Sequence, residues 1–186
     1  MKPIADKIMI IRHAEKPDGA VKGVTAAGEH APEELIVRGW QRSGALVRFF
    51  APRSGNLLAP PLATPNVIFA SKVGRHSNSW RPQHTVLELA TVLGLQLSAN
   101  HDKDDLAGLA ADAVAAPGPV LIAWEHQDIP DIVNRIVGNA TTCPQTWPGD
   151  RFDMVWVLAG PSTSGPWSFT QVPQLLLSGD SATPIA

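Results

Sequence analysis

The sequence predicts an α/β fold, a three-layer α/β/α sandwich around a mostly parallel central sheet. Short apolar runs at residues 8–11, 66–70 and 120–124 are typical of strands that are buried on both faces of a parallel sheet. Segments with a helical spacing of apolar residues separate these runs, as in strand-helix alternation. With 186 residues, the chain is long enough for one domain with a real core, and we expect a single domain over residues 1–186.

The first strand and the first helix come from the N-terminal third of the chain. Residues 8–11 read Ile-Met-Ile-Ile, and residues 14–32 are rich in Gly, Ala, Pro and charge, which indicates a loop at the exit of the strand. The apolar residues of 33–50 recur at mostly helical spacing, and Pro52 follows. These features predict a helix over residues 33–50.

The second strand, 66–70, leads to a helix whose start is set by a proline. Pro82 suits the first turn of a helix, where its missing N–H is not needed, and Gly94 suits the end. This places Arg81 at the helix N-terminus. A start near Arg75 would put the proline inside the helix at a cost of ~3 kcal/mol, so we prefer Arg81 to Arg75 as an anion ligand.

The remaining predicted elements follow the same alternation and close with a possible hairpin. In chain order they are a helix at 101–116 with acidic residues in its first turn, a strand at 120–124, a short helix at 129–137, a loop at 138–151, strands at 154–158 and 167–172, and a frayed tail from Ser178.

The composition excludes several classes of protein. A hydrophobic fraction of 44%, 17% charged residues and a net charge of −2 describe a soluble globular protein without the basic surface that nucleic acid requires. The single Cys143 provides neither an intrachain disulfide nor a zinc-binding thiolate cluster. No apolar run approaches the ~20 residues that span a bilayer, and the charged N-terminus does not resemble a signal peptide. We therefore expect a cytoplasmic protein.

Three of the predicted strands end in clusters that contain Arg or His. In a strand-helix alternation these ends share one edge of the sheet, so Arg12 and His13, Arg81 and His126 should converge. Cationic side chains repel each other unless an anion lies between them. Phosphate fits, because guanidinium groups bind phosphoryl oxygens bidentately, a helix N-terminus adds donors and a neutral imidazole can attack phosphorus.

This ordered set resembles the histidine phosphatase superfamily, the phosphoglycerate-mutase-like group, and among its members the small phosphatases. Arg12-His13-Ala14 is similar to the Arg-His-Gly of the family, residues 35–39 to its Leu-Thr-x-x-Gly, and Arg81-x-x-x-Thr85 to its Arg-Ala-x-Gln-Thr. His126 follows an apolar strand as the second histidine of the family does. The matches occur in the right order between residues 8 and 138.

The resemblance implies a metal-independent phosphatase without a cofactor. His13 would attack the phosphoryl group to form a phosphohistidine, which water would then hydrolyse. Arg12, Arg81 and His126 would bind the phosphate and neutralise the charge of its oxygens in the transition state. The expected partner is a small phosphomonoester or a phosphohistidine protein, with no nucleic acid and no membrane, and the oligomeric state stays open.

The identity of the general acid is less clear from the residues. Asp128, close to His126, ranks first. Glu125 is nearer in sequence, but on an extended strand its side chain would point away from the face of His126. Asp104 or Asp105 precedes a helix where mutase-like members carry a glutamate, and helix capping explains both equally well. A phosphoramidate or another good leaving group would need no acid.

Two other functions stay open at this point. A mutase-type phosphotransferase would use the same phosphohistidine, although the short chain argues against it. A phosphate-binding protein that has lost turnover is compatible with Ala14 in place of glycine and with Gln127 after the second histidine. Glu15 and Lys16 near the mouth of the site are interpreted as a solvated charge pair.

Overall fold

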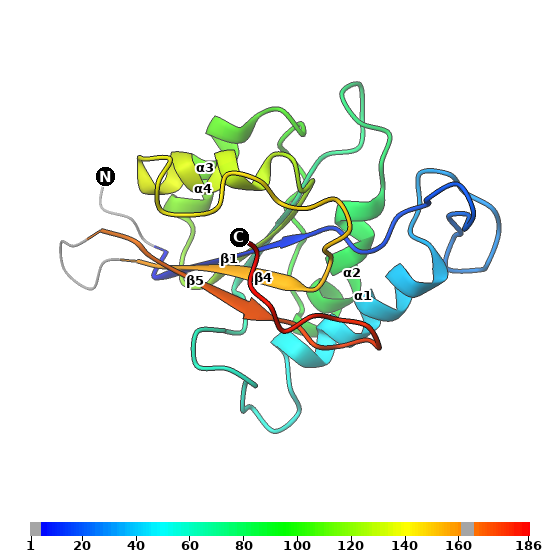
Figure 1. Ribbon diagram of the computed structural model, residues 1–186, viewed down its shortest axis with the longest axis horizontal. Helices are drawn as coiled ribbons and strands as arrows, with labels where there is room; N and C mark the ends of the chain where they lie inside the picture. The colour runs from blue at the N-terminus through cyan, green and yellow to red at the C-terminus, as the bar shows by residue number, and fades with distance from the viewer. Residues whose placement is uncertain (1–4, 161–165) are drawn as a thin grey trace.

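The computed structural model describes residues 5–160 and 166–186, and in this part of the chain five strands form a sheet of spatial order β2-β3-β1-β4-β5 (Figure 1). The strands are β1 (Lys7–Arg12), β2 (Val67–Ala70), β3 (Val120–Trp124), β4 (Met154–Ala159) and β5 (Ser168–Pro173). β3 pairs in parallel with both β1 and β2, whereas β4 pairs antiparallel with β1 and β5. Only β4 therefore runs against the other described strands, which confirms the mostly parallel sheet.

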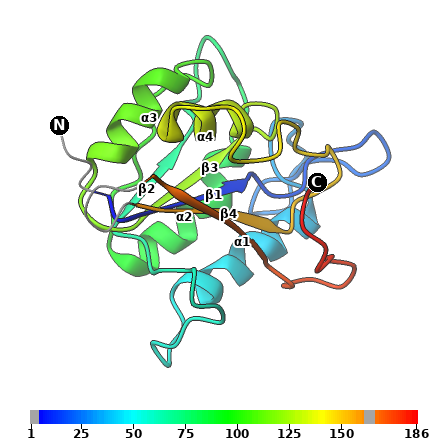
Figure 2. The same cartoon turned by 60° about the vertical axis from the view of Figure 1, so that its left-hand side comes forward.

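Helices cover both faces of this sheet. α1 (Val37–Phe50) and α2 (Arg81–Leu93) pack on one face, and α3 (Leu106–Ala115) and α4 (Ile129–Val137) on the other (Figure 2). Ile8 and Ile10 of β1 belong to the core under α3 and α4, whereas Met9 and Ile11 belong to the core under α1 and α2. Because side chains alternate along a strand, burial on both faces requires an uninterrupted apolar run. The predicted three-layer sandwich is confirmed.

Two helices begin later than their sequence patterns predict. The pattern at 33–50 includes buried residues of a loop: Ile36 is extended (φ −76°, ψ 168°), and its N–H donates to the Glu15 carbonyl at 3.1 Å. The acidic residues before α3 form a turn, and the Asp105 carboxylate accepts a hydrogen bond from the Gly108 N–H. Apolar spacing does not distinguish a buried loop from the first turn of a helix.

The C-terminal segment is anchored, so the prediction of a frayed tail is wrong. Asp180 accepts hydrogen bonds from the backbone N–H groups of Leu176 and Leu177 and forms an ion pair with Arg42. Ile185 is buried and donates its N–H to Gln171. The segment from Ser178 contains no helix or strand, and contacts with residues distant in the sequence hold it in place.

Within the described residues, no helix is both long and apolar enough to cross a membrane.

Candidate active site

The end of β1 carries two buried polar side chains, Arg12 and His13, which are 1% and 4% exposed. The His13 N–H donates to the Trp124 carbonyl at 2.9 Å and continues the pairing of β1 with β3 past the last strand residue. Burial is the main cause that lowers the pKa of Arg12 to about 10, with Glu15 opposing it. Arg12 still carries its charge at neutral pH.

The Arg12 guanidinium is held on one side and free on the other. Its Nη1 donates to the carbonyls of Gly149 (2.7 Å) and Arg151 (3.2 Å), and its Cζ lies 3.7 Å from the centre of the Phe152 ring. Its Nε and Nη2 are buried and have no hydrogen-bond partner among the described residues. The fold thus orients the guanidinium and leaves one fork of donors available.

The His13 imidazole is held in one tautomer. Its Nδ1 lies 2.7 Å from the Ala14 carbonyl, which can only accept, so Nδ1 carries the proton and Nε2 keeps its lone pair. Burial chiefly lowers the pKa of His13 to about 3; the bond to Ala14 opposes this shift, and the charges of Arg12 and Arg81 add to it. His13 is therefore neutral at pH 7 and has the unprotonated nitrogen that a nucleophile requires.

The start of α2 is bonded directly to this strand exit. Thr85 Oγ1 accepts a hydrogen bond from the Ala14 N–H at 2.8 Å and donates to the Arg81 carbonyl at 2.7 Å. Arg81, the first residue of α2, donates from Nη1 to the Pro32 carbonyl at 3.3 Å, and its Nε is buried without a partner in the described chain. Arg75 is exposed on the preceding loop.

A cavity of about 190 Å³ opens beside these residues. Its lining combines the two predicted histidines with cationic, hydroxyl and amide groups and one carboxyl group: His13, Lys16, Ser77, Ser79, Arg81, Lys103, Glu125, His126 and Gln127. Burial, followed by the charges of Arg12 and Lys16, lowers the pKa of His126 to about 4. Both histidines are therefore neutral at pH 7, and the excess of cationic side chains suits a small anion.

In residues 5–160 and 166–186, the buried side-chain nitrogen and oxygen atoms that lack a hydrogen-bond partner belong to three residues of this lining and to Arg12, which is not part of the lining but whose charge acts on both histidines. They are Arg12 Nε and Nη2, Ser79 Oγ, Arg81 Nε and Glu125 Oε2. Buried polar groups are almost always paired in native proteins, so such atoms require an explanation. The arginine nitrogens and the serine hydroxyl are donors, and a bound anion would satisfy them together.

The predicted acid lies elsewhere. Asp128 is the residue before α4 and does not line the cavity, whereas Glu125 does. The expectation about Glu125 assumed an extended strand, but the chain turns after Trp124, where the Asp128 N–H donates to the Glu125 carbonyl at 3.1 Å. Alternation along a strand does not apply in this turn, so the sequence argument against Glu125 fails.

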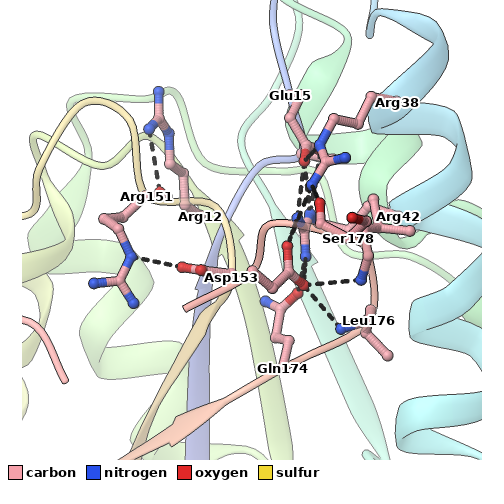
Figure 3. A network of polar contacts seen from close by, with 12 residues as sticks. Arg12, Glu15, Arg38, Arg42, Arg151, Asp153, Gln174, Leu176 and Ser178 are labelled. Carbon is pink, nitrogen blue, oxygen red and sulfur yellow. Dashed lines mark hydrogen bonds and ion pairs between the residues drawn. The ribbon is translucent and has the colours of Figure 1, made fainter. Parts of the chain in front are cut away.

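A charged network beside the site is absent from the sequence prediction. Glu15 is 6% exposed, and its carboxylate accepts hydrogen bonds from Arg38 (3.1 Å) and Arg42 (2.8 Å) (Figure 3). Arg42 also pairs with Asp180 at 2.7 Å. The interpretation of Glu15 as half of a solvated pair with Lys16 is therefore wrong. The only feature of the sequence that indicates this network is the i, i+4 spacing of the two arginines, which places them on one helix face.

This network borders a second, larger cavity of about 560 Å³. The two cavities share Lys16, and Phe152, which covers the Arg12 guanidinium, lines the larger one. No group of three or more His, Cys, Asp or Glu residues in the described ranges is arranged to hold a metal ion.

Comparison with known proteins gives matches in structure only. A scan against protein-family models and a search of curated proteins give no match. The chain is similar to a mycobacterial glucosyl-3-phosphoglycerate phosphatase complexed with VO3, with a TM-score of 0.57 and 13% identity over 90% of this chain and 98% of that chain. It is also similar to the protein histidine phosphatase SixA complexed with tungstate, with a TM-score of 0.50 and 17% identity over 90% and 97% of the two chains.

A mycobacterial hydrolase is a further structural match, with a TM-score of 0.55 and 12% identity over 89% of this chain and 96% of that chain. At this level of identity, the comparison establishes the fold. The chain has the same fold as these two phosphatases and this hydrolase, which confirms the predicted fold.

Proposed function

We propose that the protein is a metal-independent phosphatase that hydrolyses a phosphorylated substrate through a phosphohistidine on His13. One observation carries this proposal: Ser79 and Arg81, which have unpaired buried donors, line one cavity with the neutral His13, and Arg12, whose charge acts on His13, has two more. Leaving a buried donor unpaired costs about 1–3 kcal/mol. A phosphoryl group is the ligand whose several oxygens would pair all of them at once.

Binding would use the part of each cation that the fold leaves free. Arg12 would offer Nε and Nη2 as a bidentate fork, because its Nη1 is already bonded to two carbonyls. Arg81 Nε and Ser79 Oγ would bind the remaining oxygens, and the neutral His126 would add one N–H donor. Backbone carbonyls hold both arginines before the substrate arrives, as electrostatic stabilisation of a transition state requires.

The reaction would proceed in two balanced displacements at phosphorus. His13 Nε2 donates its lone pair to form the P–N bond, while the P–O bond breaks and its electron pair departs with the leaving oxygen. Water then attacks phosphorus, and the P–N bond breaks, returning the electron pair to Nε2. The Ala14 carbonyl would hold the Nδ1 proton throughout and stabilise the imidazole as it becomes positively charged.

The small cavity supports a phosphatase over the mutase-type alternative. A volume of about 190 Å³ suits one phosphoryl group with a few atoms of its leaving group. A mutase must also hold a second phosphate, and the adjoining larger cavity has more carboxylates than cationic side chains in its lining, which disfavours a second phosphate there. Two structural matches are phosphatases, one for glucosyl-3-phosphoglycerate and one for protein phosphohistidine. We propose for this chain only the reaction that both catalyse, the hydrolysis of a phosphoryl group.

The test is turnover of 4-nitrophenyl phosphate by the wild type and by His13→Ala, with and without EDTA. We expect turnover that EDTA does not change and that His13→Ala lowers at least ~10³-fold, as loss of a nucleophile does. Mass spectrometry after a denaturing alkaline quench should detect a phosphoryl group on His13 in the wild type. His30→Ala, which removes an exposed histidine, is the matched control and should behave like the wild type.

Two results would contradict the proposal. Phosphate binding without turnover of any compound in a panel of phosphate esters would indicate a binding protein. Transfer of the phosphoryl group to a second phosphorylated molecule, faster than to water, would indicate a phosphotransferase.

A further inference from the structure

Glu125 is placed beside the proposed nucleophile by the register of the sheet. β1 and β3 are parallel neighbours, and Arg12 pairs with Trp124 in the ladder. His13 and Glu125 are the residues that directly follow these two strands. Both side chains line the cavity of about 190 Å³. The carboxyl group therefore faces the space that the phosphoryl group and its leaving oxygen would share.

One oxygen of this carboxyl group is held and the other is free. Ser71 Oγ, at the end of β2, donates to Glu125 Oε1 at 3.3 Å, and Gln83 Nε2 bonds the Ser71 carbonyl at 3.0 Å. Oε2 is buried and has no partner in the described residues. Every other unpaired atom of the site can donate to a phosphate oxygen, whereas Oε2 of an ionised carboxyl group can only accept, so a bound phosphate alone does not satisfy it.

A proton on Oε2 would turn this unpaired acceptor into a donor. An ionised carboxylate would repel phosphoryl oxygens, whereas a protonated one donates an O–H bond to them. Burial chiefly raises the pKa of Glu125; Asp128 adds to the shift, and Ser71 and Lys103 oppose it. Lys16 and Arg81 are the other charged groups that line the cavity, and a bound phosphate dianion would offset their effect on the carboxyl group.

We propose that Glu125 is the general acid that protonates the leaving oxygen, and that the substrate is therefore a phosphomonoester of an alcohol, an inference that rests on the proposed phosphatase function. In the first displacement the Oε2 proton passes to the leaving oxygen as the P–O bond breaks. In the second, the Glu125 carboxylate takes a proton from the attacking water, which restores the acid. A phosphohistidine substrate would not need this group, because its imidazole leaves without a proton from the enzyme.

The experiment compares leaving groups in Glu125→Gln, which keeps the size of the side chain. With 4-nitrophenyl phosphate, whose phenolate departs without protonation, we expect kcat/KM within about threefold of the wild type. With an alkyl ester such as glycerol phosphate, we expect a loss of about 10²–10⁴-fold, the usual contribution of general acid catalysis. Asp131→Asn, an exposed position on α4, should leave both substrates unaffected.

The pH dependence gives a second measurement with a defined sign. Because the acid must be protonated, wild-type kcat/KM for glycerol phosphate should fall as the pH rises through the raised pKa of Glu125. Glu125→Gln should abolish this fall, whereas a merely structural role of Glu125 would leave it in place.

Several outcomes would overturn the inference. An equal loss on both esters, or no loss on either, would exclude Glu125 as the acid, and a selective loss in Asp128→Asn instead would assign the role to Asp128. A wild type that hydrolyses 4-nitrophenyl phosphate but no alkyl phosphate would refute the substrate class. In each case the phosphohistidine on His13 would still form, whereas its absence would refute the proposed function itself.

Discussion

Ser79 and Ser43 carry buried hydroxyl groups that differ in what they bond. Ser43 Oγ donates to the His84 carbonyl at 2.8 Å, whereas Ser79 Oγ has no partner in the described residues. A polar group that is buried without a partner lowers the stability of the free protein. Its presence is explained if the hydroxyl serves a ligand, so the two serines can be separated by experiment.

Ser79→Ala should weaken phosphate binding about tenfold, which corresponds to the loss of one hydrogen bond to a charged group. The free energy of unfolding should stay the same or rise, because an unpaired hydroxyl is removed. Inorganic phosphate as a competitive inhibitor and urea denaturation measure the two effects. Ser43→Ala should do the reverse, lowering stability by about 1 kcal/mol without changing phosphate binding. Equal inhibition constants for Ser79→Ala and the wild type would remove Ser79 from the proposed site.

The ends of the apolar runs predicted some residues of the candidate site and missed others. Arg12, His13 and His126 follow apolar runs directly, and the proline after Arg81 separated it from other arginines. Ser79 lies in a segment without periodicity, so nothing in its neighbourhood indicates burial.

The bounds of helices and strands were predicted closely where a glycine, a proline or the end of an apolar run marks them. Gly94, a left-handed residue with φ 67°, ends α2 as expected, and the apolar runs gave β1, β2 and β3. The starts of α1 and α3 depend on whether a residue is bonded to its own helix or to a distant loop. Ile36 bonds to Glu15, and sequence spacing does not carry that information.

The first turn of α1 packs against the backbone that follows His13. A Cβ on Gly39 would lie 2.6 Å from the Glu15 carbonyl oxygen and 3.1 Å from the Glu15 nitrogen, whereas a Cβ on the exposed Gly44 would meet no atom within 4 Å. The close contact requires glycine at position 39, whereas no neighbouring atom requires it at position 44. Alanine should therefore lower the stability of the protein at the first position and raise it at the second.

Gly39→Ala should lower the free energy of unfolding by about 1–3 kcal/mol, the cost of overpacking, and lower kcat by displacing the loop that holds His13. Gly44→Ala should raise the free energy of unfolding by about 0.5–1 kcal/mol, because alanine favours the helix, and keep kcat unchanged. Urea denaturation and steady-state kinetics test both variants. If Gly39→Ala proved as stable and as active as Gly44→Ala, α1 would not position the catalytic loop.

For the molecule as a whole, the C-terminal segment closes around the site from the far end of the sequence. Asp180 pairs with Arg42, which pairs with Glu15, and Arg42 Nη1 also donates to Gln174 at 3.0 Å. This ion pair between Arg42 and Asp180 joins residues 138 positions apart, and no local pattern predicts such a contact.

The same segment also supports Arg12. The Asp153 carboxylate binds Arg151 Nε at 2.7 Å (Figure 3). The Ser181 N–H donates to the same carboxylate, and Arg151 Nη2 donates to the Thr183 carbonyl at 2.9 Å. The Arg151 carbonyl is one of the two that hold the Arg12 guanidinium. The tail is thus linked through Arg42 to the loop after His13, and it contacts the loop that orients Arg12.

Asp180→Asn should therefore destabilise the protein and impair catalysis together. Arg42, which is 2% exposed, would keep Glu15 as its remaining counter-ion, so we expect the loss of this partner to cost about 1–3 kcal/mol. Thermal and urea denaturation should show this loss, and kcat should fall as Glu15 and the loop behind His13 lose their support. Asp131→Asn, which breaks an exposed i, i+4 pair with Arg135, should cost under about 0.5 kcal/mol.

Acid should remove the contribution of Asp180 in the wild type. Burial opposes ionisation of Asp180, but hydrogen bonds from Arg42 and from the backbone outweigh it and lower its pKa below the ordinary 3.8. The stabilising contribution is therefore complete above the ordinary pKa and is lost as the pH falls through the lowered one. The difference in unfolding free energy between wild type and Asp180→Asn should accordingly be constant near neutral pH and shrink below pH ~4. A difference that grew with acidity, or an Asp180→Asn variant no less stable than Asp131→Asn, would show that the pair does not hold the tail in place.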